Sequence, residues 1–301
     1  MKPAVYLLVL SWNMHKDTIE CIESLNKLKY ENYKILIIDN ASSDDSVKIL
    51  RERFPSVEVI QNSENLGFAE GNNVGMRYAL SEGADYVFIL NNDLTLDEDS
   101  LSQLIDAAQN MPLVGMLAPK VYYYDYPKII NSLGTSMNWF KLRPYLSFCG
   151  QEDNGQFTQI REVQILVGCA LLVKKETIER IGLIDKDFFI FHEEADWCLR
   201  NLKSGYKNVV VPSAMAYHKA SLTMKNFSSL TNYYNIRNFL YLTKKNASLL
   251  NKIKVISGLC FLVCKNILFL LSVSQKKLAY SFFSGVIDYF KGNMGRCKRT
   301  F

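Results

Sequence analysis

The stretch FILNNDLTLDED (88–99) holds the pattern that decides the fold, because an apolar run of strand length ends abruptly on two asparagines and an aspartate. A buried strand running into a turn explains the polarity, since Asn and Asp are common turn formers. A metal site explains it equally well, because Mg²⁺ and Mn²⁺ prefer carboxylate and amide oxygens as ligands. On this stretch alone the two interpretations are about even.

Three further apolar runs of strand length come earlier in the chain, at AVYLLVL (4–10), KILIID (34–39) and VEVI (57–60). Segments with helical spacing separate these runs, at about 16–28, 43–53 and 70–81. Strands that are apolar throughout and alternate with helices are typical of a parallel sheet with helices on both faces. The first third of the chain therefore predicts an α/β fold.

Polar side chains stand at the carboxyl ends of three predicted strands. They are Ser11, Trp12 and Asn13, then Asp39 and Asn40, and then Asn91, Asn92 and Asp93. In open α/β sheets, ligands bind beyond the carboxyl ends of the strands. The coincidence of three such clusters favours a binding site over a simple turn at Asn91–Asp93.

Two of these regions suit a nucleotide. Asp39 or Asn40 is able to accept the N3–H of a uracil or thymine ring or to bind a ribose hydroxyl, although the same residues also suit the start of a helix. The run NLGFAEGNNVG (65–75) has three glycines, which permit close backbone approach to a ligand. It differs from the dinucleotide fingerprint, because its glycines do not directly follow a strand. A dehydrogenase is therefore disfavoured.

The densest acidic stretch is HEEAD (192–196), where Glu193, Glu194 and Asp196 crowd the start of a predicted helix. Negative charge is favoured there by the helix dipole alone. The functional interpretation is a general base, because displacement at a sugar carbon by an alcohol needs a carboxylate to take the hydroxyl proton. His218 follows a later strand, and its spacing alone favours a packing or hydrogen-bonding role.

Charge is distributed unevenly along the chain. The net charge is +5, yet the segment from Lys244 to the end holds 11 Lys or Arg and one acid, Asp288. Its uncharged apolar runs are about 10 residues long, whereas a spanning helix needs about 20. Lysines interleaved with Phe and Leu predict helices that lie on an anionic membrane surface. An oligomer interface, or a helical pair packed on the body, is the alternative.

The N-terminal apolar run is interpreted as a strand and not as a signal segment, because no small-residue cleavage site follows it. We therefore expect a cytosolic body. The seven cysteines are scattered without a CxxC pair, and the chain has three histidines, which argues against a zinc site and for reduced, mostly buried thiols.

Seven stretches of the sequence occur in an order that resembles glycosyltransferase family 2, and within it the rhamnosyltransferase-like branch of bacterial polysaccharide synthesis. They are SWN (11–13), IIDNASSDDS (37–46), NLGFAEGNN (65–73), FILNND (88–93), VGCALLVKKE (167–176), FFIFHEEADWCLRNLKSGY (188–206) and AYHKAS (216–221). The resemblance implies a GT-A fold, which is Rossmann-like with a mostly parallel sheet and helices on both faces. A C-terminal helical, membrane-associating extension is expected in addition.

The expected domain division follows from this resemblance. A GT-A domain would cover residues 1–225, with a nucleotide-binding part at about 1–118 and an acceptor-binding part at about 119–225. A basic, apolar helical region would cover residues 226–301.

The resemblance also implies site residues. The donor, dTDP-rhamnose or a UDP-sugar, would be bound by Leu10, Ser11, Trp12, Asp39, Asn40, Gly67, Asn72, Asn91, Asn92 and Asp93. Mn²⁺ or Mg²⁺ would be bound by Asp93 and His218. Because Asn91 stands at the first acidic position of the family's DXD-type motif, Asp93 is the one confident carboxylate ligand there. Glu194 would be the catalytic base, with Glu193 as its acidic neighbour and Asp196 as nearby support; an exchange of roles between the two glutamates stays open.

The implied reaction is an inverting displacement from a nucleotide-diphosphate sugar to a hydroxyl of a glycan or polyprenyl-linked acceptor, as in O-antigen or capsule synthesis. It would take place at the cytoplasmic face of the inner membrane, with no nucleic-acid partner, and a homodimer stays open. One alternative is a nucleotidyltransferase-like enzyme, which is disfavoured because no glycine- and lysine/arginine-rich loop follows the first strand. The other is a non-catalytic nucleotide-sugar-binding protein, disfavoured by the joint presence of Asp93, Glu194 and His218.

Overall fold

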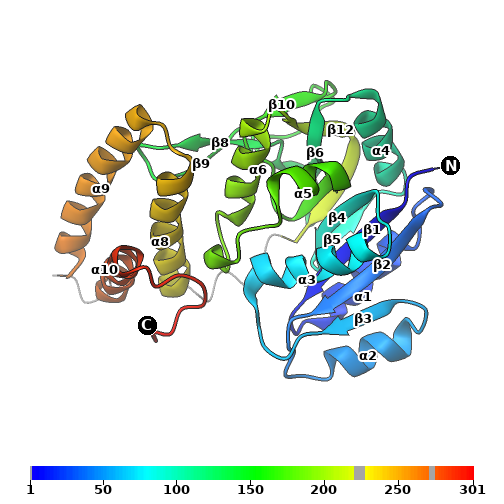
Figure 1. Ribbon diagram of the computed structural model, residues 1–301, viewed down its shortest axis with the longest axis horizontal. Helices are drawn as coiled ribbons and strands as arrows, with labels where there is room; N and C mark the ends of the chain where they lie inside the picture. The colour runs from blue at the N-terminus through cyan, green and yellow to red at the C-terminus, as the bar shows by residue number, and fades with distance from the viewer. Residues whose placement is uncertain (1, 220–227, 271–274) are drawn as a thin grey trace.

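The computed structural model describes residues 2–219, 228–270 and 275–301. Figure 1 shows a sheet with helices packed on it and, beside this body, a group of three C-terminal helices. The sheet has ten strands in the order β10-β12-β6-β11-β4-β1-β2-β3, with β5 paired to β12 and β7 paired to β6.

The first third of the chain alternates strands and helices as predicted. The elements are β1 (Val5–Ser11), α1 (His15–Leu25), β2 (Tyr33–Asp39), α2 (Ser46–Arg53), β3 (Glu58–Gln61), α3 (Gly67–Ser81) and β4 (Tyr86–Asn91). β1 pairs in parallel with β2 and β4, and β2 pairs in parallel with β3. Successive side chains point to opposite faces: Leu8 and Ile38 lie in a core shared with α3, whereas Leu7 and Ile37 lie in a core shared with α1. Helices therefore cover both faces.

The middle of the chain completes the sheet. Its elements are β5 (Leu94–Leu96), α4 (Ser100–Asn110), β6 (Val114–Tyr123), β7 (Tyr126–Ser132), β8 (Thr135–Asn138), β9 (Arg143–Leu146), β10 (Arg161–Val163), β11 (Ala170–Lys174), α5 (Lys175–Ile181), η1 (Lys186–Phe188), α6 (Glu193–Lys203) and β12 (Lys207–His218). β11 lies antiparallel between β4 and β6. The sheet is consequently mixed rather than mostly parallel, because short strands and loops, instead of a crossover helix, connect β6 to β11.

The C-terminal region is helical, with α8 (Ser228–Asn246), α9 (Leu249–Leu270) and α10 (Lys276–Lys291). The helix α9 runs unbroken for 22 residues, or about 33 Å, and is long and apolar enough to cross a membrane. The expectation that no segment is long enough was wrong, because Lys254 and Lys265 do not interrupt the helix. Cys260 and Cys264 lie exposed on it, and three of the seven thiols are buried, so the prediction of mostly buried thiols was also wrong.

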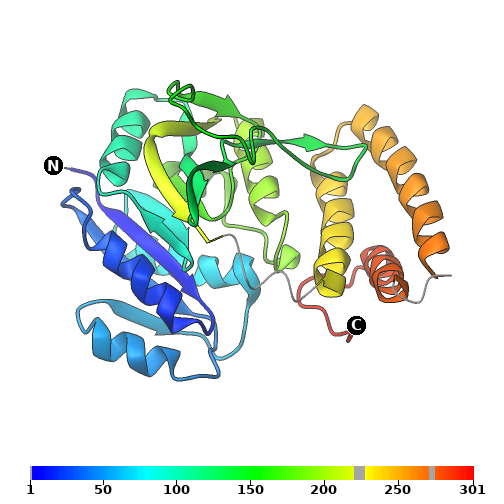
Figure 2. The same cartoon turned by 180° about the vertical axis from the view of Figure 1, so that it is seen from behind.

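The hairpin of β8 and β9 joins the body to α9, as both views of the molecule show (Figures 1 and 2). A Cβ at Gly258 of α9 would lie 1.9 Å from the Phe140 carbonyl oxygen, at the tip of this hairpin. Only glycine permits so close an approach of helix and loop. The body and the C-terminal helices are therefore in direct contact through the hairpin, in addition to the contact of α6 with α8.

Candidate active site

The polar strand ends meet at one edge of the sheet. Ser11 lies beside Asp39, and Leu10 lies beside Asn91, in the register of the parallel strands. Trp12 follows directly and is 44% exposed, so its ring offers an open apolar face at this edge. The predicted clusters are thus brought together as the parallel sheet requires.

The polar side-chain atoms of Ser11 and Asn40 form hydrogen bonds with other residues of the chain. Ser11 Oγ lies 2.9 Å from Thr18 Oγ1 of α1. The Asn40 amide donates to Asn65 Oδ1 (3.1 Å) and to the Gly67 carbonyl (3.0 Å) and accepts from the Leu66 backbone N–H (3.0 Å). Both side chains are buried. These bonds tie the strand ends to α1 and to the loop before α3, and the base and ribose contacts that the resemblance implies stay a prediction.

Asp39 is fully buried at the end of β2. Its carboxylate accepts from the backbone N–H of Ser42 at 3.0 Å and from the Ser42 hydroxyl. The carboxylate therefore shapes the loop after β2, and Ser42 Oγ in turn accepts a hydrogen bond from the Asn13 backbone N–H at 2.7 Å. The loops after β1 and β2 are tied together by these bonds.

The glycine-rich run brings its backbone close to other parts of the chain, and the ligand approach predicted for it stays a prediction. A Cβ at Gly67, where φ is +77°, would lie 2.5 Å from the Phe189 carbonyl oxygen, and one at Gly71 would lie 2.7 Å from Leu10 Cδ1. The Phe189 carbonyl also accepts from the first N–H groups of α3, with Phe68 at 2.7 Å. Asn72 donates to the Phe68 carbonyl, and its Oδ1 is buried without a hydrogen-bond partner among the described residues.

Asp93 and His218 form a close pair across the sheet edge. β5 pairs with the end of β12 so that Leu94 lies opposite His218. His218 Nε2 is then 3.1 Å from Asp93 Oδ1 and 3.4 Å from Asn91 Nδ2. The three residues of β5 suffice for this antiparallel pairing. The neighbouring Asn92 donates to Thr18 Oγ1 at 3.1 Å and so points toward α1.

The Asp93–His218 pair fits a divalent cation in its chemistry. A carboxylate oxygen and an imidazole nitrogen suit Mn²⁺, and the carboxylate suits Mg²⁺. Their side chains are 12% and 14% exposed, respectively, so both are largely buried and keep only a small accessible surface. Within residues 2–219, 228–270 and 275–301, no group of three or more His, Cys, Asp and Glu is gathered to hold a metal ion.

Glu194 approaches the same edge from α6. A Cβ at Gly168, just before β11, would lie 3.5 Å from Glu194 Cβ. The next residue, Cys169, accepts a backbone hydrogen bond from Asn91 at 2.9 Å. Burial raises the pKa of the Cys169 thiol, and the negative charges of both Asp93 and Glu194 raise it further. One thiol therefore lies within electrostatic reach of both candidate acids.

The two glutamates have different environments. Glu193 is 5% exposed, and its pKa is raised well above the usual range by burial and by the charge of Glu194. Glu194 is half-buried, and burial raises its pKa to about 6, against opposing backbone N–H groups at the start of α6. With a pKa of about 6, Glu194 is mostly ionised at neutral pH, which suits it to the role of the base.

Asp196, predicted as nearby support for the base, points away from this edge toward α8. Its carboxylate is fully buried and lies 2.8 Å from Arg200 Nε, 3.1 Å from Lys245 Nζ and 2.7 Å from Asn246 Nδ2. Two residues along a helix rotate a side chain by about 200°, so Asp196 and Glu194 lie on opposite sides of α6. Asp196 docks α6 onto α8.

Backbone strain collects around the site. Residues with positive φ occur in the loops after β1 and β2 and before α6, at Asn13, Met14, Ala41, Phe189, Phe191 and His192. Such conformations persist only where surrounding contacts hold them, and they concentrate at functional sites.

Sequence reasoning missed Lys219, which holds α1 against this edge. Its Nζ lies 2.6 Å from both Asp17 and Glu20, and its backbone N–H donates to the Asp93 carbonyl at 3.0 Å. The only available signal was its position next to His218.

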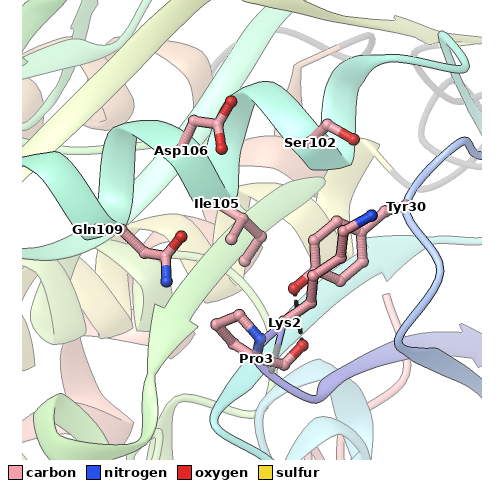
Figure 3. A pocket seen from close by; sticks show the side chains of 7 residues that line it. All are labelled: Lys2, Pro3, Tyr30, Ser102, Ile105, Asp106 and Gln109. Carbon is pink, nitrogen blue, oxygen red and sulfur yellow. Dashed lines mark hydrogen bonds between the residues drawn. The ribbon is translucent and has the colours of Figure 1, made fainter.

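A cavity of about 510 Å³ lies elsewhere (Figure 3). It is lined by Lys2, Pro3, Tyr30, Ser102, Ile105, Asp106 and Gln109. Lys2 and Pro3 directly precede β1, so this cavity is at the amino ends of the parallel strands, opposite the polar edge. Its position argues against a role in the same chemistry.

A mixed α/β sheet with polar side chains gathered at the carboxyl edge of its parallel strands is the arrangement expected of a GT-A glycosyltransferase. The chain matches the family model Glycosyl transferase family 2 over residues 7–182, and it belongs to this family. It is 22% identical over 265 residues to the dTDP-rhamnosyl transferase RfbF of Shigella flexneri, covering 82% of each chain.

Two other proteins extend the comparison. The N-acetylglucosaminyl-diphospho-decaprenol L-rhamnosyltransferase of Mycobacterium tuberculosis is 25% identical over 246 residues, which cover 75% of this chain and 80% of the relative. The mannosyltransferase PcManGT from Pyrobaculum calidifontis, solved in complex with GDP-Man and Mn²⁺, has a TM-score of 0.60 and 14% identity, covering 96% of this chain and 88% of its own. The predicted family, its rhamnosyltransferase-like branch and the GT-A fold are confirmed.

Proposed function

We propose that this protein is an inverting, metal-dependent glycosyltransferase that transfers rhamnose from dTDP-rhamnose, or another sugar from a UDP donor, to a hydroxyl of a glycan or polyprenyl-linked acceptor. The observation that carries the proposal is that Glu194, with a pKa of about 6, approaches the same edge as the Asp93–His218 pair. The names of the relatives, a dTDP-rhamnosyl transferase and a rhamnosyltransferase for a decaprenol-linked sugar, support this donor and acceptor class.

The chain's own residues account for the reaction as follows. Trp12 offers its exposed ring to the base of the donor. Glu194, ionised at neutral pH, takes the proton of the acceptor hydroxyl. That oxygen attacks the anomeric carbon while the bond from this carbon to the diphosphate oxygen breaks on the opposite face, so the configuration inverts. Asp93 and His218 would hold a divalent cation, which when bound neutralises the charge of the leaving diphosphate.

Transfer to a synthetic polyprenyl-diphosphate sugar tests this proposal. We expect product with dTDP-rhamnose or with one of a panel of UDP-sugars, inversion at the anomeric carbon by NMR, and loss of transfer with EDTA that Mn²⁺ or Mg²⁺ restores. Thermal-shift screening identifies the donor first, since a ligand that binds the folded state raises its melting temperature. Retention of configuration, or full activity in EDTA, would contradict the proposal.

The C-terminal region favours peripheral attachment to the cytoplasmic face of the inner membrane. Large apolar side chains are exposed on α9 and on the adjoining hairpin, at Leu249, Leu250, Ile253, Ile256, Phe261, Ile267, Leu268, Phe140, Tyr145 and Leu146. Lys252, Lys254 and Lys265 are exposed on the same helix. An apolar face edged with lysines suits an anionic lipid surface, where a lipid-linked acceptor would be presented.

Flotation of the full chain with phosphatidylglycerol-containing vesicles tests this attachment. Binding is expected to weaken with salt and in the double variant Ile256→Asn/Phe261→Asn, whereas the control Leu113→Asn, which alters an exposed apolar residue of the body, keeps it. Loss of a dimer in the double variant, with vesicle binding unchanged, would instead assign this face to an oligomer interface.

A further inference from the structure

The loop before α6 is held in a conformation that its own residues disfavour. Phe189, Phe191 and His192 have φ values of 63°, 71° and 69°, and Glu193 and Glu194 follow at once. The left-handed region is unfavourable for bulky side chains, so outside contacts must stabilise it. Because Glu194 lies in the first turn of α6, the contacts that stabilise this loop also set the position of the Glu194 side chain.

Asn238 of α8 supplies those contacts. Its Nδ2 group donates to three carbonyls of the loop, those of Phe188 at 2.7 Å, Ile190 at 2.8 Å and Phe191 at 3.0 Å. Asn238 is fully buried, so water does not compete for these bonds. A single side-chain amide therefore gathers the carbonyl groups of the strained turn around itself.

Arg237 fixes the orientation of this amide. Its Nε donates to Asn238 Oδ1 at 2.9 Å, which leaves both amide hydrogens for the loop. Its Nη1 donates to the Gly295 carbonyl at 2.7 Å, and the Gly295 N–H donates to the Asp187 carbonyl at 2.8 Å. The guanidinium is fully buried among these groups. The segment that follows α10 thus closes over both Arg237 and the start of the loop.

We propose that Asn238, oriented by Arg237, is a positioning residue for the base Glu194, so that the C-terminal helices are a working part of the active site as well as a means of attachment. This inference rests on the proposed transferase function. It predicts that loss of the amide moves the start of α6 while the nucleotide-binding edge, built from β1, β2 and β4, stays intact.

Asn238→Ala tests the proposal, with Asn232→Ala as the matched control. Asn232 lies on the same helix and also donates two bonds, to the Leu278 carbonyl (2.9 Å) and to Ser281 Oγ (3.0 Å), but these hold α10 and not the loop. Asn238→Ala should lower kcat about 10- to 100-fold, leave the donor KM within about twofold, and shift the acidic limb of the pH profile of kcat. Asn232→Ala should lose thermal stability and keep both kcat and the limb.

Hydrogen exchange of residues 188–196 gives a readout that needs no activity. Exchange should be faster than in the wild type in Asn238→Ala and unchanged in Asn232→Ala. The exchange rate of Asn238→Ser, which keeps one donor, should lie between those of the wild type and Asn238→Ala. The serine variant replaces the alanine variant in the test if the latter does not fold. Unchanged loop exchange, or a kcat that falls only with the folded fraction, would overturn the positioning role. A wild-type protein without transfer would overturn the proposed function instead, and loop exchange would still decide whether Asn238 holds the loop.

Discussion

Replacing Asp196 by Asn separates docking from catalysis. Asp196 belongs to the acidic cluster that includes the candidate base, yet its carboxylate contacts Arg200, Lys245 and Asn246 on the far side of α6. The variant keeps the size of the side chain and removes its charge. We therefore expect it to weaken the contact of α6 with α8 and to leave the chemistry of each folded molecule largely intact.

The magnitude follows from the contacts. Hydrogen bonds to charged groups contribute about 1.5–3 kcal/mol to stability and neutral ones about 0.5–1.5 kcal/mol. The bonds of residue 196 to the cations Arg200 and Lys245 lose the carboxylate charge in the variant, so each weakens by about 1 kcal/mol. Lys245 keeps its ion pair with Asp185, and Arg200 keeps its bond to the Leu183 carbonyl, which limits the loss. The free energy of unfolding should fall by about 2 kcal/mol, which lowers the melting temperature of a chain of 301 residues by roughly 3 °C.

Chemical denaturation gives the free energy of unfolding, and transfer assays normalised to the folded fraction give the activity. The wild-type protein measured at the same temperature is the reference. An Asp196→Asn variant that melts like wild type but has lost transfer would refute the docking role and restore Asp196 to the catalytic machinery.

Three further predictions concern the acids at the sheet edge. Transfer should rise with pH through about 6, because Glu194 must be ionised to act as the base. The folded-state pKa of Glu194 is raised, so the stability that this residue contributes is lost as the pH rises from the ordinary glutamate pKa to about 6. Thermal melts measured across this pH range will show the loss. Glu193→Gln should raise the melting temperature near neutral pH and keep transfer, since it removes a buried acid with a raised pKa; a lower melting temperature would contradict this. Asp93→Asn should weaken Mn²⁺-dependent donor binding by more than about tenfold, as calorimetry will show, and have little effect on binding in EDTA.

The parallel part of the fold was predictable because buried parallel strands are apolar along their whole length. The runs at 4–10, 34–39 and 86–90 are of this kind, and the polar residues after them mark the carboxyl edge where ligands bind. The mixed second half was not predictable in the same way. β11 is apolar like β1 and β4 of the parallel part, and nothing in its composition shows that it runs antiparallel to β4 and β6.

The contacts of single side chains were harder to predict. His218 meets Asp93 across 125 positions of sequence, through a strand of three residues that has no local signal. The three acids of HEEAD lie on different sides of α6. Helical periodicity therefore does not distinguish Glu194, which faces the sheet edge, from Asp196, which faces α8. Glycines such as those of 65–75 serve close packing as readily as ligand approach, and the sequence does not show that Gly71 packs against Leu10 and Gly67 against Phe189.

The identity of the base is the central claim, and paired glutamine variants test it most directly. Donor binding and transfer are measured for Glu194→Gln and Glu193→Gln under the same conditions. We predict that Glu194→Gln lowers transfer by about 10²- to 10⁴-fold while donor affinity stays within about twofold, and that Glu193→Gln retains transfer. Substantial transfer by Glu194→Gln, or a loss confined to Glu193→Gln, would contradict the account.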